Sequence, residues 1–198
     1  NEFVINLSSL DKEVYDLSLQ HCKNSIEVSK RINSKKYAFH AGFLTDINVK
    51  ETGNLIKRKK LANRNNAIER FCEAFTKLIS FSAGEVDLFV ENNIITQENY
   101  KNFLNVNPFL LTDKKSYEEL KSFIDFNILI DLGHLNVSSE TLNLDIDDEA
   151  NFFLEIAKYI HFSENNKIAD ENLAFSSNNN AYRHLSKNKL DKKIISLE

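Results

Sequence analysis

Short apolar runs alternate with longer amphipathic segments along the whole chain, and this alternation predicts its secondary structure. Each apolar run has the length and β-branched or aromatic content typical of a buried strand. The runs predict six strands, at 37–39, 87–90, 109–111, 127–130, 158–160 and 194–197. An extended segment at 3–7 precedes them.

The segments between these runs have helical spacing. A helix is predicted to begin near Ser8 and to continue to about Ile32, with acidic residues in its first turn. A second helix is expected to bury a face made of Ile68, Phe71, Phe75, Leu78 and Ile79. Shorter helices are predicted around 117–123 and 149–156. Strands that are apolar throughout and separated by helices indicate a parallel sheet covered by those helices, in an α/β barrel or an open sheet.

Composition narrows the class of protein. The 198 residues are 42% hydrophobic and 27% charged, and no break in composition divides them, so we expect one globular domain over 1–198. The net charge of −4 argues against nucleic acid as a partner. The basic run at 57–60 is interpreted as a solvated loop or helix start. Cys22 and Cys72 fall in predicted helices and fit reduced thiols in a cytoplasmic protein. No apolar run approaches the ~20 residues of a membrane span.

Candidate chemistry lies where the strands end. Five strands are each followed directly by a potential ligand: His40, Glu91, Asp131, His161 and Glu198. In a parallel barrel all carboxyl ends of the strands meet at one face, so these side chains are expected to converge. Histidine mixed with carboxylates suits one divalent cation such as Mn²⁺, Mg²⁺, Co²⁺ or Zn²⁺. No glycine-rich phosphate loop occurs, so no nucleotide cofactor is indicated.

The order of these strand ends resembles a known family. The segments Phe39-His40-Ala41-Gly42, Val90-Glu91-Asn92-Asn93, Ile130-Asp131-Leu132-Gly133-His134, Ile160-His161-Phe162-Ser163-Glu164-Asn165 and Leu197-Glu198 follow one another as in the xylose-isomerase-like TIM-barrel superfamily. Its sugar phosphate isomerase/epimerase branch is the most similar. The resemblance extends from Phe3 to Glu198 and implies a (β/α)8 barrel.

The resemblance also implies a site and a reaction. It places a divalent metal on Glu91, Asp131, His161 and Glu198, with Glu91 and Glu198 as the acid/base pair on opposite faces of the substrate. His134 would contact a substrate oxygen. The implied activity is isomerisation or epimerisation of a sugar or sugar phosphate, by proton transfer through a metal-stabilised enediolate.

Four further residues are predicted to bind substrate, and they are His40, Glu164, Lys167 and Asp170.

Two other functions stay open. The same superfamily contains apurinic-site endonucleases with clustered zinc ions; His40, His134 and Asp170 match their pattern, whereas Asn172 stands where a histidine is expected. The third hypothesis is a binding or structural protein that kept the fold without turnover. His21 and His184 are interpreted as surface groups.

A full barrel has eight strands and roughly 250 residues. The resemblance therefore implies that the first two strands and a closing helix are missing, and we expect the chain to be a segment of a longer protein. The expected partner is a small carbohydrate; a homodimer is common for such barrels, but nothing in the sequence indicates one.

Overall fold

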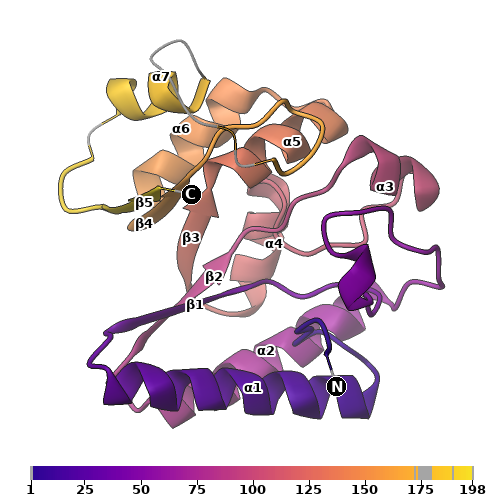
Figure 1. Ribbon diagram of the computed structural model, residues 1–198, viewed down its shortest axis with the longest axis vertical. Helices are drawn as coiled ribbons and strands as arrows, with labels where there is room; N and C mark the ends of the chain where they lie inside the picture. The colour runs from indigo at the N-terminus through magenta and orange to yellow at the C-terminus, as the bar shows by residue number, and fades with distance from the viewer. Residues whose placement is uncertain (1, 172, 174–179, 189, 198) are drawn as a thin grey trace.

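A computed structural model describes residues 2–171, 173, 180–188 and 190–197 (Figure 1). The strands are β1 (Lys36–His40), β2 (Asp87–Glu91), β3 (Asn127–Asp131), β4 (Tyr159–Phe162) and β5 (Ile194–Leu197). The helices are α1 (Lys12–Arg31), α2 (Arg64–Ser82), α3 (Gln97–Asn102), α4 (Lys114–Phe123), α5 (Leu132–Leu142), α6 (Ile146–Ile156) and α7 (Asn180–Lys187), with a 3-10 turn η1 (Val49–Glu51).

The strands form one parallel sheet in the order β1-β2-β3-β4-β5. This curled, helix-covered sheet is a half-barrel, which agrees with the predicted parallel α/β class. Figure 1 shows the sheet passing from β1, beside α1 and α2, to β5, near α7. The register pairs His40 with Glu91 and Asp131 with His161, so the polar strand ends lie at the same edge.

One predicted strand is wrong. Residues 109–111 form only an isolated antiparallel bridge, from Phe109 to Phe43, and the described sheet has five strands rather than six. Leu111 adopts a positive φ of 57°, which ends the extended conformation. The segment instead lies across the ends of β1 and β2, where Leu110 N donates to Gly42 O at 3.0 Å and Asn93 N donates to Leu111 O at 2.9 Å. Its apolar residues are buried because the segment covers the ends of β1 and β2, and they do not form a strand of the sheet.

The first two helices form largely as predicted. α1 begins at Lys12, four residues after Ser8, because Asp11 caps it by accepting from the backbone of Glu13 and Val14. α2 buries the expected face, except that Ile79 is 47% exposed. Ile79 therefore lies outside the stripe that contacts the sheet.

The helix-facing side of the sheet supplies the main core. Leu88, Val90, Ile128, Ile130 and Ile160 belong to one buried cluster with side chains from α1, α2, α4 and α6. Because side chains alternate along a strand, Glu91 and Asp131, which follow Val90 and Ile130, point to the side of the sheet opposite the helices. A second, smaller cluster lies with the loops beyond the strand ends and contains Phe43, Ile56, Ile95, Phe103 and Phe109.

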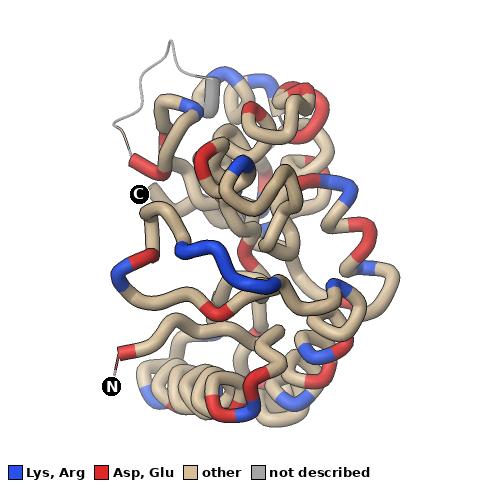
Figure 2. Tube along the Cα trace, turned by 90° about the vertical axis from the view of Figure 1, so that its right-hand side faces the viewer, with Lys and Arg blue, Asp and Glu red and all other residues tan. Residues whose placement is uncertain are grey.

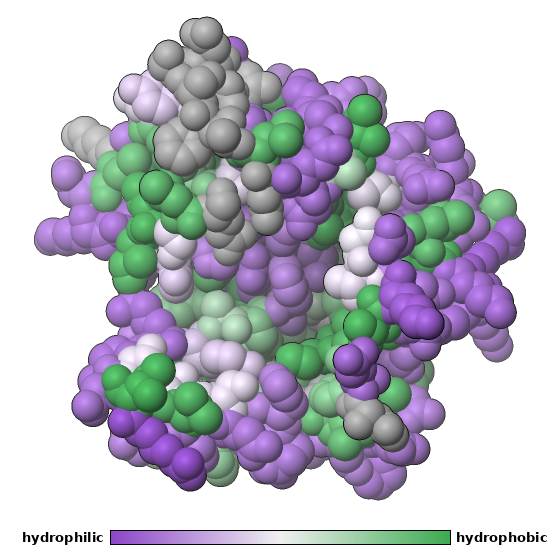
Figure 3. Space-filling model, viewed as in Figure 1, coloured by the Kyte–Doolittle hydropathy of each residue, from purple (hydrophilic) through white to green (hydrophobic). Residues whose placement is uncertain are grey.

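The remaining sequence predictions concern the basic run, the cysteines and membrane spans. The basic run at 57–60 is an exposed loop, as expected, and forms a continuous blue segment in Figure 2. Hydrophilic surface dominates the face in Figure 3, with smaller hydrophobic patches between. Both cysteines are free thiols within helices. Among the described helices, none combines the length and the apolarity needed to cross a bilayer.

Candidate metal centre and the adjoining cavities

The ends of four neighbouring strands bring together four of the five predicted ligands. His40 Nε2 lies 3.8 Å from Glu91 Oε2, across the β1–β2 pair. His161 Nδ1 lies 3.3 Å from Glu91 Oε1 and 3.9 Å from Asp131 Oδ2. Glu91 is therefore at the centre of the cluster. The fifth predicted ligand, Glu198, lies outside the described residues, as does Asn172.

These side chains form two overlapping sets of potential ligands. Glu91, Asp131 and His161 make one set, and His40, Glu91 and His134 make the other. In each set, one ligand atom per residue lies within 4.8 Å of the others. Both sets use Glu91, so the arrangement offers one cation site, or two adjacent sites that share a carboxylate.

The two buried carboxylates differ in their electrostatics. Burial raises the pKa of Glu91, but a hydrogen bond from His161 and the nearby imidazoles of His40 and His134 outweigh it, so this pKa is lowered. Burial raises the pKa of Asp131 above its ordinary value, despite the favourable effect of His134. Asp131 is fully buried, and its Oδ2 accepts no hydrogen bond from the described part of the chain.

The residues present fit a divalent cation. Two carboxylates and one imidazole are a donor set that Mn²⁺, Co²⁺ and Zn²⁺ accept readily. A buried carboxylate oxygen without a hydrogen-bond donor is costly unless a cation or a water satisfies it. The orphaned Asp131 Oδ2, beside Glu91 and His161, is the observation on which this fit rests.

Asp131 is held from its other side by helix α5. This helix begins directly after β3, and Asp131 Oδ1 caps it by accepting from His134 N at 2.8 Å. A side chain at Gly133 would force its neighbours to shift, since a Cβ there would lie 2.3 Å from Ser163 Oγ and 3.1 Å from Asp131 Oδ1. The glycine thus lets α5 approach the loop that follows β4.

His134 and Asp170 form an ion pair next to this centre. His134 Nε2 lies 3.2 Å from Asp170 Oδ2. Burial lowers the pKa of His134, but the hydrogen bond to Asp170 and the charges of Asp131 and Glu91 dominate and raise it to about 10. The same hydrogen bond lowers the pKa of Asp170. In this state the pair carries one positive and one negative charge at neutral pH.

Two other predicted substrate contacts, Glu164 and Lys167, lie in the segment that follows β4. Glu164 is buried, and its Oε1 accepts from Asn165 N at 3.1 Å. Lys167 has a positive φ of 68°, and its Nζ lies 3.6 Å from Glu140 Oε2 on α5. The structure therefore brings His40, His134 and Asp170 to the centre but directs Lys167 toward Glu140.

A cavity of about 200 Å³ adjoins His40, His134 and Asp170. Its apolar wall contains Val4, Phe43, Ile47, Ile94 and Phe109, and its polar wall contains Glu51, Thr52, Asn54, Asn93, Thr96 and Asn99. This volume is below the roughly 300 Å³ at which pockets for drug-sized ligands begin. The cavity is thus suited to a small molecule with both polar and apolar surface.

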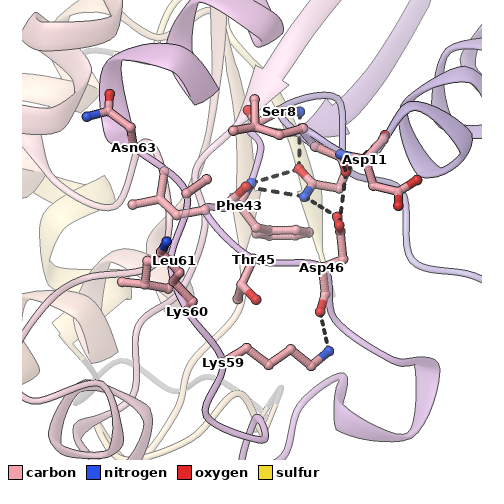
Figure 4. A pocket seen from close by; sticks show the side chains of 14 residues that line it. Ser8, Asp11, Phe43, Thr45, Asp46, Lys59, Lys60, Leu61 and Asn63 are labelled. Atoms are coloured by element: carbon pink, nitrogen blue, oxygen red, sulfur yellow. Dashed lines mark hydrogen bonds between the residues drawn. The ribbon is translucent and has the colours of Figure 1, made fainter.

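A larger hollow of about 600 Å³ also has Phe43 in its lining, and Figure 4 shows the side chains around it. Its polar groups largely bond to one another. Asp46 accepts from Asn6 Nδ2 at 2.8 Å and from Ser9 Oγ at 3.0 Å, and its carbonyl accepts from Lys59 Nζ at 2.7 Å. These groups hold the loops together, so the smaller cavity is the better candidate for substrate.

Sequence reasoning missed several buried polar residues. Asn92 and Asn93, directly after Glu91, are almost fully buried and tie the strand ends together. Their position directly after a buried strand is the feature of the sequence that could have pointed to them. His184 is also buried, at 4% exposure, so its interpretation as a surface group is wrong. It lies on α7, with Nε2 3.4 Å from Asp147 Oδ1.

Comparison of the sequence with family models and with curated proteins gives no match. Comparison of the fold with solved structures does give matches. A D-tagatose 3-epimerase-like protein superimposes with a TM-score of 0.68 at 18% identity, over 98% of this chain and 66% of that one. The 3-keto-D-glucoside 4-epimerase of E. coli gives 0.66 at 8% identity, over 98% and 68%. Endonuclease IV from Thermus thermophilus gives 0.57 at 14%, over 96% and 64%.

These likenesses confirm the predicted resemblance to xylose-isomerase-like barrels at the level of the fold. The chain spans about two thirds of the length of these three solved structures. At such low identity the fold is what the comparisons establish. The two kinds of neighbour, sugar epimerases and an endonuclease, are also the two enzyme classes that the sequence suggested.

Proposed function

We propose that this chain belongs to a divalent-metal-dependent isomerase or epimerase that acts on a sugar or sugar phosphate. The observation that carries the proposal is the set of Glu91, Asp131 and His161 at one end of a parallel sheet, which includes the buried Asp131 Oδ2 that has no hydrogen-bond donor among the described residues. A small cavity beside it offers space for the substrate. The fold neighbours include two proteins whose names describe them as sugar epimerases or similar to one.

Glu91, Asp131 and His161 would hold the metal, together with Glu198, which follows β5 in the sequence. When bound, a divalent cation supplies Lewis-acid stabilisation of negative charge that develops on substrate oxygens. The protein's part is to hold these ligands in place and to keep Glu91 deprotonated. The lowered pKa of Glu91 already favours its charged form.

The same glutamates supply the proton-transfer groups. Glu91 in its charged form would accept a proton from the carbon next to the substrate carbonyl, and Glu198 in its protonated form would give one to the opposite face. Proton exchange with solvent would then restore both carboxyl groups for the next turnover. His134 and Asp170, at 3.2 Å from each other, face the cavity and bind substrate hydroxyls. His40 borders the same cavity. Glu164 and Lys167, in the segment after β4, are the remaining proposed substrate contacts, and Lys167 would have to leave Glu140 to reach the substrate.

A second candidate is a metal-dependent hydrolase of the apurinic-site endonuclease type. One observation favours it: His40, Glu91 and His134 form a second possible ligand set that shares Glu91 with the first. Adjacent metal sites that share a ligand suit hydrolysis by two ions. The net charge of −4 weighs against a nucleic-acid substrate.

The number of bound ions separates these functions. We would purify the full-length protein, measure its divalent metals by elemental analysis before and after chelation, and repeat this with Asp131→Asn. Asp87→Asn is the matched control, because Asp87 is an exposed carboxylate at the opposite end of β2.

About one ion per chain, lost in Asp131→Asn but kept in Asp87→Asn, is the expected result. Two or three ions would favour the hydrolase, and no ion under any condition would leave a non-catalytic barrel. With one ion confirmed, a screen of ketoses and their phosphates follows. Glu91→Gln should then abolish turnover while the protein stays folded; full activity in this variant would remove Glu91 from its proposed role.

A further inference from the structure

Asn92 connects the end of β2 to the end of β3 through its side chain. Its Nδ2 donates to Asp131 O at 3.1 Å, and its Oδ1 accepts from Asp131 N at 2.7 Å. Regular pairing between these strands ends earlier, where Glu91 faces Leu129. The side-chain amide therefore takes the place of a peptide group on β2 and extends the ladder to Asp131.

The backbone of Asn92 also contacts the histidine that follows Asp131. His134 Nδ1 lies 2.9 Å from Asn92 O. A carbonyl oxygen only accepts hydrogen bonds, so Nδ1 carries a proton, and Nε2 is directed to Asp170 and the cavity. One fully buried residue thus fixes both the backbone of Asp131 and the ring of His134.

From these contacts we infer that Asn92 is a positioning residue for the metal centre. It sets where the Asp131 carboxylate points and which nitrogen of His134 faces the substrate cavity. This inference rests on the proposed function, because it gives Asp131 and His134 their roles. Outer partners of this kind typically change metal affinity by about 10–100-fold when they are removed.

The chain contains a matched control for this role. Asn6 is buried to a similar extent and makes the same two-way contact with Phe43: Phe43 N donates to Asn6 Oδ1 at 3.0 Å, and Asn6 Nδ2 donates to Phe43 O at 3.2 Å. Neither Asn6 nor Phe43 belongs to a ligand set. Asn6→Ala therefore reports the loss of a buried backbone-pairing amide without the loss of a ligand contact.

The test compares wild type, Asn92→Ala and Asn6→Ala as full chains. Mn²⁺ binding is measured by calorimetry, unfolding by urea, and the His134 Nδ1 proton by NMR in the metal-free protein. Both variants are expected to unfold at lower urea concentration. Only Asn92→Ala should weaken Mn²⁺ binding, by about 10–100-fold, and shift or broaden the His134 Nδ1 proton signal.

Mn²⁺ affinity that is unchanged in Asn92→Ala, or weakened equally in Asn6→Ala, would overturn the inference. If wild type binds no Mn²⁺, the proposed metal function fails instead. The NMR signal then decides the positioning role by itself: an unchanged His134 resonance in Asn92→Ala shows that Asn92 does not orient the ring.

Discussion

The helix-facing side of the sheet and its polar strand ends are built from alternate residues of the same strands, yet they follow opposite rules. Val90 and Ile130 are completely buried among other apolar side chains. Glu91 and Asp131, the next residues, are almost as buried, but among charged and polar groups. Burial of the apolar side chains stabilises the fold, whereas burial of the carboxylates away from water destabilises it.

This difference teaches where stability and function lie. The apolar side contains stacked and edge-on aromatic rings and packs against residues of α1 and α2. The polar end contains a carboxylate with a raised pKa and an oxygen without a donor. Such features are costly in a structure without a ligand, and they are typical of functional sites. Variants on the two sides should therefore separate folding from metal binding.

The largest effect on folding is expected from Phe75→Ala. Phe75 is 1% exposed and contacts Phe71, Phe39 and Phe126, with ring centroids 6.1–6.4 Å apart. Removing the ring leaves a cavity and should lower the free energy of unfolding by about 3–5 kcal/mol. Urea denaturation measures this. Ile79→Ala, on the exposed side of the same helix, is the control and should stay within about 0.5 kcal/mol of wild type.

Metal affinity of the folded Phe75→Ala protein should equal that of wild type. A large loss of affinity in protein that is still folded would contradict the separation of the two sides.

An intermediate effect is expected from Gly133→Ala, which acts at the junction of the two sides. The new methyl group would lie 2.3 Å from Ser163 Oγ and 3.1 Å from Asp131 Oδ1. We expect a loss of about 1–3 kcal/mol in stability, since buried groups must shift to make room, and weaker Mn²⁺ binding because Asp131 is one of them. Urea unfolding and calorimetry measure the two losses.

The double variant Gly133→Ala/Ser163→Ala removes the closest contact and should recover most of the stability. No recovery in the double variant would show that the cost arises elsewhere, for example in the backbone of α5.

The smallest effect concerns the cysteines of the apolar side. Burial raises the pKa of Cys22 to about 11, so its thiol stays protonated at pH 8, and the reactive thiolate is scarce. Cys72 is only partly buried, and burial raises its pKa less far. An aromatic disulfide reagent at pH 8 should therefore label Cys72 first. Cys22 should react only in urea or as the pH approaches 11; equal rates in the folded protein would show that the core around Cys22 opens readily.

The sequence predicted the parallel α/β class because its apolar runs and helical stripes are regular. Where prediction failed, long-range contacts decided the outcome. Residues 109–111 look like a strand, but hydrogen bonds to the ends of β1 and β2 fold them into a cover. Ile79 follows Phe75 by four residues, which is helical spacing, but it is 47% exposed while Leu78 is fully buried. His184 looked like a surface group, yet the packing of α7 buries it.

For the site, strand-end position was sufficient to select His40, Glu91, Asp131 and His161, which the structure brings together. The roles of these residues, and the position of Glu198, stay predictions. Position after a buried strand marks Asn92 as a strand-end residue, but it could not reveal that Asn92 pairs with Asp131, because that depends on which residue lies across the sheet. Nor could it show that Lys167 is directed to Glu140, since the direction of a side chain in a loop depends on contacts remote in sequence.

The sequence by itself determined five strands, most of the helices and the residues at the strand ends, because periodicity and residue type can be seen in neighbouring residues. Only the tertiary structure decided that Glu91 lies at the centre of two ligand sets, that Asp131 Oδ2 is buried without a donor, and that Asn92 extends the ladder to Asp131. The physical reason is register. A parallel sheet brings residues some forty positions apart to within a few ångströms, and hydrogen bonds between strands, rather than local preference, select which residues meet.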